Sequence, residues 1–391
     1  MSVNSEFYRG DIMAPIVAGV TFALEIVLVP MVLIALREDL QLTEAQLPWV
    51  YNAYSIAVAL AVLVGGWLGD RLGVRQVFAA GVSLFALGGV IVALSGQFET
   101  FLLGRVLQGI GGGLFSPLVP ILLTSARSEK PGKILMIWGS IAGYVVALVP
   151  LLGAQVIAGL GWKLVFVALA VMALLAFAVS LTVSAGAGAK APGSRPDLRA
   201  FARLLASRSL MQVYTYIFCT YGCITFFLFH LPLALDDAGA TAGFAGVVLC
   251  ALWLSFAMAS TMLSNAVDGK WIGPISVAAP ICLLLGVALL VHLPSSAGFL
   301  AAAIAIGVGF ACSNAPSTQL VLKHAPEGLR SLASSLDITL ARLGGVALVA
   351  ALAGRDGAVV LGSVAVLVLL SVLCIWTLTR GRGQTPLREG A

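Results

Sequence analysis

Four charged residues lie inside long apolar stretches of this sequence, where an unpaired charge is costly. They are Glu25, Arg105, Asp337 and Arg342. An ionised side chain near the centre of a bilayer costs about 2.5–3.5 kcal/mol or more, so such residues are usually functional or paired. Because burial favours a neutral carboxyl group, Glu25 is a candidate proton carrier, a counter-charge for a cationic substrate, or a packing residue hydrogen-bonded to a neighbour.

The two arginines need water or a counter-charge, because a guanidinium group does not deprotonate in proteins. Structurally, Arg105 would tie its own helix to the helix that carries Glu25. Asp337 and Arg342 are five residues apart, about 140° around a helix, so they need not pair directly. Asp337 is either a second protonatable group or a solvated residue near a helix end.

The composition indicates that these charges are embedded in a membrane. The chain is 60% hydrophobic and 10% charged, with a mean hydropathy of +1.05, whereas soluble domains are about 25% charged. The net charge of +5 does not indicate a nucleic-acid partner, because the basic residues lie in loops. The six cysteines lack metal-ligand spacing, and no nucleotide loop or nucleophile triad is apparent. We therefore expect neither a metal site, nor a cofactor, nor enzymatic activity, and no cleavable signal peptide is evident.

Twelve apolar segments have the length that a membrane-spanning helix needs. They cover about 12–36, 47–69, 76–96, 100–124, 133–158, 162–184, 210–233, 242–265, 271–293, 296–322, 330–353 and 356–379. The longest polar gap is basic and predicts a linker with a short amphipathic helix from Leu198. The expected division is an N-terminal half (1–184), a cytoplasmic linker (185–209) and a C-terminal half (210–391). Most Lys and Arg residues lie in turns that share the side of the linker, so both termini are predicted to be cytoplasmic.

The two halves resemble each other in sequence. Gly109-x-Gly111 recurs as Gly307-x-Gly309, and Pro117 recurs as Pro316. Parallel repeats of this kind place a substrate site between two halves related by an axis along the membrane normal.

The turn between the second and third segments carries the most specific motif, G-W-L-G-D-R-L-G-V-R-Q. It resembles the loop 2–3 signature of the major facilitator superfamily, although Val74 stands where a basic residue is usual. The matching residues are Gly66, Leu68, Asp70, Arg71, Gly73 and Arg75. The resemblance implies a twelve-helix bundle of two pseudo-symmetric six-helix halves, with this turn as a conformational latch that includes Gly66, Asp70, Arg71, Gly73 and Arg75.

Other segments resemble the drug:proton antiporter branch of that superfamily. Leu24-Glu25 followed by Pro30, and Arg105 two residues before Gln108-Gly109, fit the pattern. The segment around Pro150 departs from the antiporter signature at Val145, Val149 and Ala154. The resemblance implies that Arg105 tunes proton transfer at a nearby carboxyl group. The predicted proton-coupling residues are Glu25, Arg105 and Asp337, and the predicted cavity residues are Glu25, Tyr54, Arg105, Tyr214, Phe226, Trp253, Asn314 and Arg342.

The sequence thus predicts a monomeric transporter of the inner membrane that exports a small amphipathic or cationic compound in exchange for protons. Two alternatives stay open. One is a proton-coupled uptake symporter for an organic anion or metabolite, in which Arg105 and Arg342 bind the carboxylate; a Glu25 that is paired and free of substrate favours it. The other is a non-transporting membrane receptor that keeps the fold.

Overall fold

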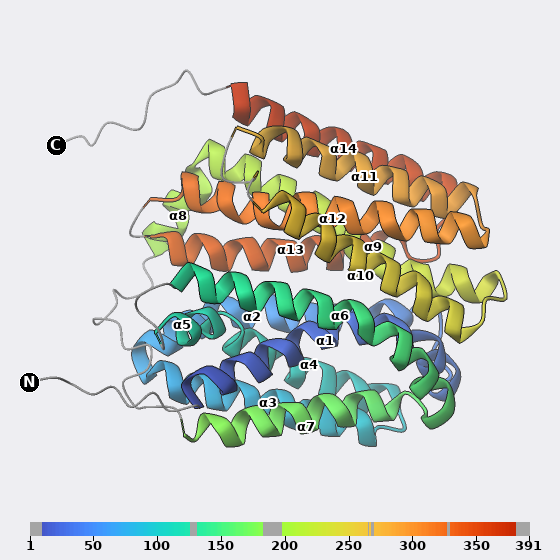
Figure 1. Cartoon of the computed structure of the whole chain (residues 1–391), viewed down its shortest axis with the longest axis horizontal. Helices are drawn as coiled ribbons and strands as arrows, with labels where there is room; N and C mark the ends of the chain where they lie inside the picture. The colour runs from blue at the N-terminus through green and yellow to red at the C-terminus, as the bar shows by residue number, and fades with distance from the viewer. Residues whose placement is uncertain are drawn as a thin grey trace, which may run out of the picture.

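A computed structural model describes residues 10–125, 131–182, 198–264, 266, 270–326 and 329–380. These parts of the chain form fourteen α-helices (Figure 1). The helices of the N-terminal half are α1 (Gly10–Asp39), α2 (Leu47–Leu72), α3 (Val74–Leu94), α4 (Phe98–Phe115), α5 (Leu118–Ser125), α6 (Pro131–Leu160) and α7 (Lys163–Ser180). The others are α8 (Leu198–Ala206), α9 (Arg208–Asp237), α10 (Ala242–Leu263), α11 (Ile272–His292), α12 (Ser296–His324), α13 (Arg330–Leu352) and α14 (Gly357–Arg380).

Twelve helical segments correspond to the twelve predicted spans. Eleven are long and apolar enough to cross a membrane within the described residues, and the 30-residue helix α6 supplies the twelfth. One span differs from the prediction of a continuous helix over 100–124. It is divided into α4 and α5 at Ser116 and Pro117, where Pro117 has no N–H to donate to the carbonyl of Gly113. The related Pro316 lies inside the continuous helix α12.

The exposed surface of the bundle is apolar in a way that soluble proteins avoid. Leu152, Met262 and Leu369 are 70%, 79% and 70% exposed. A helix that is apolar on all sides belongs in a large core or in lipid. These side chains therefore face the hydrocarbon of a bilayer.

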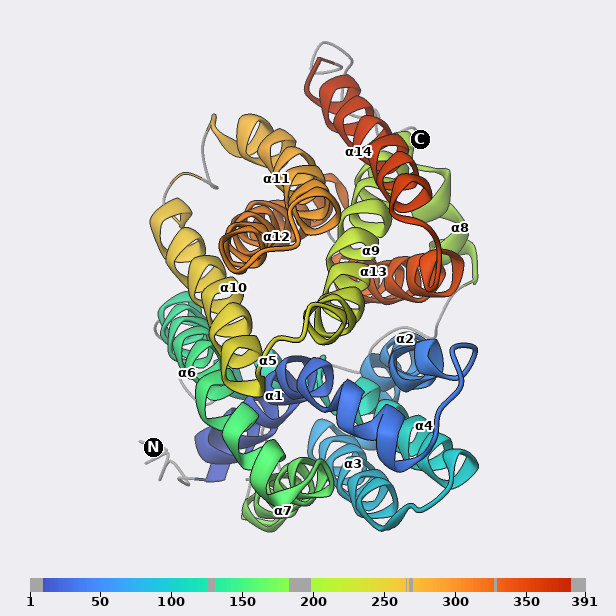
Figure 2. The ribbon, with the colours of Figure 1, turned by 90° about the vertical axis from the view of Figure 1, so that its right-hand side faces the viewer.

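The two halves lie side by side, with α1–α7 in one group and α9–α14 in the other (Figures 1 and 2). They meet where α6 packs on α10 and where α2 packs on α13. Helix α8 begins at Leu198, as predicted from the sequence, and lies at the end of the bundle where α1 begins and α14 ends. We call this the α8 end and the opposite one the far end. Linker residues 183–197 lie outside the described part of the chain.

The turn of the predicted latch joins α2 to α3 through a single residue. Gly73 has φ +98°, which an L side chain rarely adopts, so glycine is required there. Arg75 donates a hydrogen bond to the carbonyl of Leu181, just after α7, and Arg71 lies over the ring of Trp67. The side chain of Asp70 is outside the described residues, so its role as a latch stays a prediction.

Close helix contacts depend on glycines of the repeated motifs. A Cβ atom at Gly109 of α4 would lie 2.5 Å from the backbone oxygen of Tyr54 in α2. At the equivalent contact of the other half, a Cβ atom at Gly307 of α12 would lie 2.2 Å from the backbone oxygen of Leu252 in α10. Small residues let membrane helices approach this closely.

We expect Gly109→Val to lower the apparent melting temperature of the detergent-purified protein, because the new side chain would separate α2 from α4. Overpacking of this kind costs about 1–3 kcal/mol. Gly362→Ala is the matched control, since a Cβ atom there would have no neighbour within 4 Å and φ is ordinary. Equal melting temperatures for Gly109→Val and wild type would show that the contact is not close in the membrane protein.

Candidate functional site

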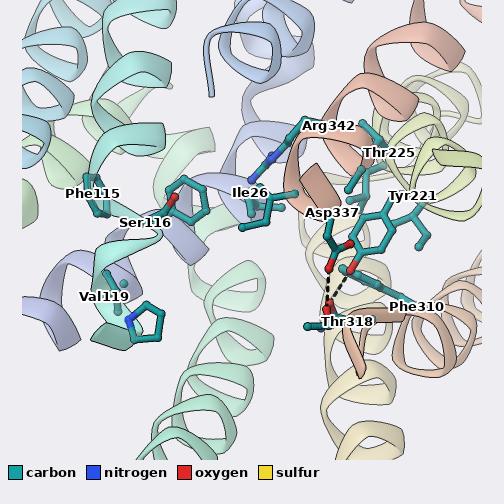
Figure 3. A pocket seen from close by; sticks show the side chains of 18 of the residues that line it. Ile26, Phe115, Ser116, Val119, Tyr221, Thr225, Phe310, Thr318, Asp337 and Arg342 are labelled. Atoms are coloured by element: carbon teal, nitrogen blue, oxygen red, sulfur yellow. Dashed lines mark hydrogen bonds between the residues drawn. The ribbon is translucent and has the colours of Figure 1, made fainter. Parts of the chain in front are cut away.

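A cavity of about 380 Å³ lies between the two halves (Figure 3). Helices α1, α4 and α5 form one wall, and α9, α12 and α13 form the other. Its lining reaches Leu123 near the end of α5 and Thr318 in the second half of α12, so the cavity extends toward the α8 end. Most of the lining is apolar, including Phe22, Phe115 and Phe310.

Polar groups of this cavity are concentrated on the C-terminal wall. Thr318 donates a hydrogen bond of 3.0 Å to the Asp337 carboxylate (Figure 3). Tyr221 donates a hydrogen bond to the side-chain oxygen of Asn314. Arg342, one and a half turns after Asp337 on α13, also lines the cavity. Its guanidinium carbon lies 5.4 Å from the centroid of the Phe22 ring, a cation–π distance across the boundary between the halves.

A buried ion pair lies outside the lining of this cavity. Nη1 of Arg105 is 2.7 Å from Oε1 of Glu25, and the two side chains are 1% and 2% exposed. Arg105 also donates to the backbone oxygen of Val50 and to Oε1 of Gln108, at 3.2 and 3.0 Å. The pair therefore holds α1, α2 and α4 together.

Tyr54 lies next to both arginines. The guanidinium carbon of Arg105 is 4.5 Å from the centroid of its ring, and that of Arg342 is 5.9 Å away. The Tyr54 side chain is 2% exposed, and its hydroxyl has no hydrogen-bond partner among the described residues. One aromatic ring thus contacts a cation of each half.

The far end is closed by contacts between the halves. The Tyr51 hydroxyl of α2 donates to the backbone oxygen of Leu228 in α9, at 3.3 Å. That carbonyl is left without its helical donor by Pro232 four residues later. Asn52 donates to the backbone oxygen of Val346 in α13, at 3.4 Å. The structure therefore represents a conformation whose cavity lies on the α8 side of these contacts.

Of the predicted cavity residues, Asn314 and Arg342 line this cavity, as does the predicted proton-coupling residue Asp337. Glu25, Tyr54 and Arg105 do not; they are brought together one layer behind it.

Three predicted aromatic wall residues are placed differently from the prediction. Tyr214 is buried with its hydroxyl on the backbone oxygen of Ala333. Phe226 is buried and stacks on His230. Trp253 lies behind Phe310, with a centroid distance of 6.0 Å. None of the three lines the cavity in the conformation described here.

The lining residues that sequence reasoning missed include Phe22, Phe115, Tyr221, Phe310 and Thr318. The sequence did contain a signal for Tyr221. Like Tyr214, it is an aromatic residue with a polar hydroxyl, and it lies two turns later on the same face of the same helix. Phe22 lies three residues before Glu25, so the two side chains are on roughly the same face of α1, but this spacing alone does not single out Phe22.

We expect Arg105→Gln to lower the apparent melting temperature strongly, because it leaves the buried Glu25 carboxylate without its partner. Removing one member of a buried pair costs about 3–5 kcal/mol. The double variant Glu25→Gln/Arg105→Gln should recover much of this loss. Lys163→Gln is the control: it disrupts an exposed contact of 3.9 Å with Asp39, for which about 0–1 kcal/mol is expected. Additive effects of the two buried substitutions would contradict the pairing.

Parts of the chain are similar to bacterial resistance and export proteins. Over 154 residues it is 36% identical to the tetracenomycin C resistance and export protein of Streptomyces glaucescens, covering 38% of this chain and 28% of that protein. Over 175 residues it is 29% identical to the multidrug resistance protein MdtL of Escherichia coli, covering 44% and 45%. The matched regions thus span less than half the length of these relatives.

The fold is similar to those of solved transporter structures over nearly the whole chain. A D-xylose–proton symporter superimposes with a TM-score of 0.75 at 17% identity, covering 97% of this chain and all of that one. The nucleoside transporter NupG gives a TM-score of 0.72 at 15% identity, covering 96% and 100%. At these identities the likeness shows the fold alone.

A sequence model for one family matches residues 15–349, which is most of the chain and includes both halves of the bundle. Together with the twelve-helix fold and the central cavity, this match shows that the chain is a multi-pass membrane protein of the Major Facilitator Superfamily, a family of secondary transporters.

Proposed function

We propose that this transporter exports small amphipathic organic compounds in exchange for protons, by alternating access. The observation that carries the choice of substrate is the central cavity walled by aromatic residues. The buried Glu25–Arg105 pair one layer behind it supports proton coupling, which export by exchange and uptake by symport have in common. The printed names of the relatives, which describe resistance and export, support the direction of transport.

In this proposal Glu25 is the group that gains and loses the coupling proton. In the conformation described here its Oε1 lies 2.7 Å from Nη1 of Arg105, a charge-assisted contact between a carboxylate and a guanidinium group. Protonation removes that attraction and leaves Arg105 as a buried cation with less compensation, which destabilises this arrangement of α1 and α4. Proton binding therefore favours a different conformation, as exchange requires.

The cavity suits a compound with an apolar body and a few polar groups. Phe22, Phe115 and Phe310 offer aromatic surface, while Asn314, Asp337 and Arg342 offer hydrogen bonds and charges of both signs. Apolar walls with few convergent polar groups are typical of small-molecule sites.

One observation favours a second candidate, a proton-coupled symporter for an organic anion. Glu25 is paired with Arg105 and does not line the cavity, whereas Arg342 does. No ion pair of Arg342 is found among the described residues, so its charge is available to a carboxylate. Accumulation of an organic anion inside cells that carry the protein would support this candidate over export.

We expect Glu25→Gln to abolish proton-driven transport, because the amide imitates the protonated acid and cannot titrate. The measurement is substrate-induced proton flux in proteoliposomes, with compounds first identified by comparing drug and metabolite accumulation in cells with and without the protein. Binding of neutral compounds should survive the substitution.

Asp337→Asn is the matched variant, since it also neutralises one buried carboxyl group of a membrane helix. If Glu25→Gln retains the wild-type ratio of protons to substrate while Asp337→Asn loses it, the coupling proton belongs to Asp337 and our assignment is wrong.

We further propose that the protein lies in the cytoplasmic membrane with the α8 end facing the cytoplasm. The Lys and Arg bias of the turns supports this orientation. A single cysteine introduced at Arg203 of α8 should resist a membrane-impermeant thiol reagent in intact cells and react after permeabilisation. Reaction in intact cells would reverse the topology.

A further inference from the structure

We infer that Tyr54 transmits the charge state of the Glu25–Arg105 pair to Arg342, and so makes the sign of the charge that the cavity favours depend on protonation. The inference rests on the proposed role of Glu25 and adds to it a positioning residue and a rule for substrate charge.

The geometry provides one shared partner for two cations. The Tyr54 ring contacts Arg105 of α4 at 4.5 Å and Arg342 of α13 at 5.9 Å. A cation is attracted to an aromatic ring within about 6 Å of its centroid. Arg105 is held by the Glu25 carboxylate, while Arg342 lines the cavity.

Tyr54 itself is fixed in place. Gly109 lets α4 approach the backbone of Tyr54, and Gly112 leaves room for its hydroxyl, since a Cβ atom there would lie 3.2 Å from that oxygen and 3.1 Å from the Phe22 ring. Phe22 also contacts Arg342. Because the ring is held in place, an Arg105 that moves onto it comes closer to Arg342, and the two like charges then repel more strongly.

Neutralising Glu25 changes which cation Tyr54 holds. Arg105 then loses its carboxylate and keeps only the Val50 oxygen and Gln108. The Tyr54 ring already lies 4.5 Å from the guanidinium carbon of Arg105, and its hydroxyl oxygen has no hydrogen-bond partner among the described residues. Arg105 moves onto Tyr54, and Arg342 is repelled toward the cavity.

Other charged groups near the pair do not provide this link. The titratable neighbours of Glu25 are Tyr51 and Tyr54 of α2 and Arg105 of α4, with Arg342 of α13 acting through Tyr54. Asp337 of α13 lines the cavity but is hydrogen-bonded to Thr318.

The remaining neighbours of the pair are aromatic. Helix α7 contributes Phe166, whose ring centroid lies 5.8 Å from the guanidinium carbon of Arg105, and α9 contributes Phe229, which packs against Tyr51. Among the described residues Glu25 forms no other ion pair.

The consequence is a rule for coupling. A neutral Glu25 makes the cavity more positive, so it disfavours a cationic substrate and favours an anionic one. Protons then exchange with cations and travel together with anions, and the charge of the substrate decides between the two candidate functions.

The test measures the cavity's electrostatic potential and needs no known substrate. A cysteine at Thr225, which lines the cavity (Figure 3), is modified by an anionic and by a cationic methanethiosulfonate, and the ratio of the two rates reports the local potential. The protein without this cysteine gives the background from the six native cysteines, five of which are buried. Glu25→Gln imitates protonation at a single pH, so titration of Asp337 does not contribute.

We expect Glu25→Gln to raise the anion-to-cation rate ratio about fivefold when residue 54 is Tyr or Phe, because both keep the ring. In the Tyr54→Leu background, Glu25→Gln should change the anion-to-cation rate ratio less than about twofold. In the Arg342→Gln background, Glu25→Gln should likewise leave the ratio nearly unchanged. An equal effect of Glu25→Gln with Leu at position 54 overturns the inference, as does no effect in the wild-type background. The proposed function is tested separately by proton flux, which can fail while this thermodynamic cycle holds.

Discussion

The structure depends on a carboxylate and a guanidinium group that meet away from both water and lipid. Each alone would be costly in this place, and only their 2.7 Å contact makes the arrangement tolerable. The rest of the N-terminal half accommodates the pair: the Val50 carbonyl and Gln108 occupy further donors of Arg105, and Gly109 lets the helix of Arg105 approach that of Tyr54. Because desolvation penalties are high for both ions, a single proton on Glu25 changes the balance of the whole cluster.

The pair and the central cavity form two layers rather than one site. In the proposed function, substrate meets the aromatic rings and the polar groups of α12 and α13 that line the cavity, while the coupling proton is held behind them on α1. In the proposed function, this separation lets a cavity that offers both apolar and polar contacts accept different compounds while the same carboxyl group carries the proton. It also makes communication between the layers necessary, and Tyr54 is the residue that contacts the charged groups of both.

Much of the fold could be predicted from the sequence because lipid imposes simple rules. Span lengths, the start of α8 at Leu198 and the glycine repeats follow from hydrocarbon thickness, charge placement and close packing. The division of α4 from α5 could not be predicted from Pro117 alone, because the related Pro316 leaves α12 continuous. Packing around each proline, rather than its presence, decides whether the helix breaks.

The charged residues of the candidate site stand out in the sequence, whereas the side of the helix that most of its aromatic residues face does not. Glu25 and Arg105 stand out because a charge in an apolar span is rare, and the structure pairs them. Tyr214 and Phe226 lie on α9 and Trp253 on α10, and the neighbours that each side chain meets depend on tertiary contacts that a single sequence does not encode locally.

The most direct test of the central claim is to observe the proton on Glu25 itself. Infrared difference spectroscopy of the reconstituted protein can detect the carbonyl stretch of a protonated carboxyl group, and its absence in Glu25→Gln assigns the band. Our account predicts that this band appears when the protein leaves the conformation with the paired Arg105 under an inward proton gradient, and disappears when the pair forms again. A Glu25 that remains a carboxylate in every conformation and at every pH would contradict the account.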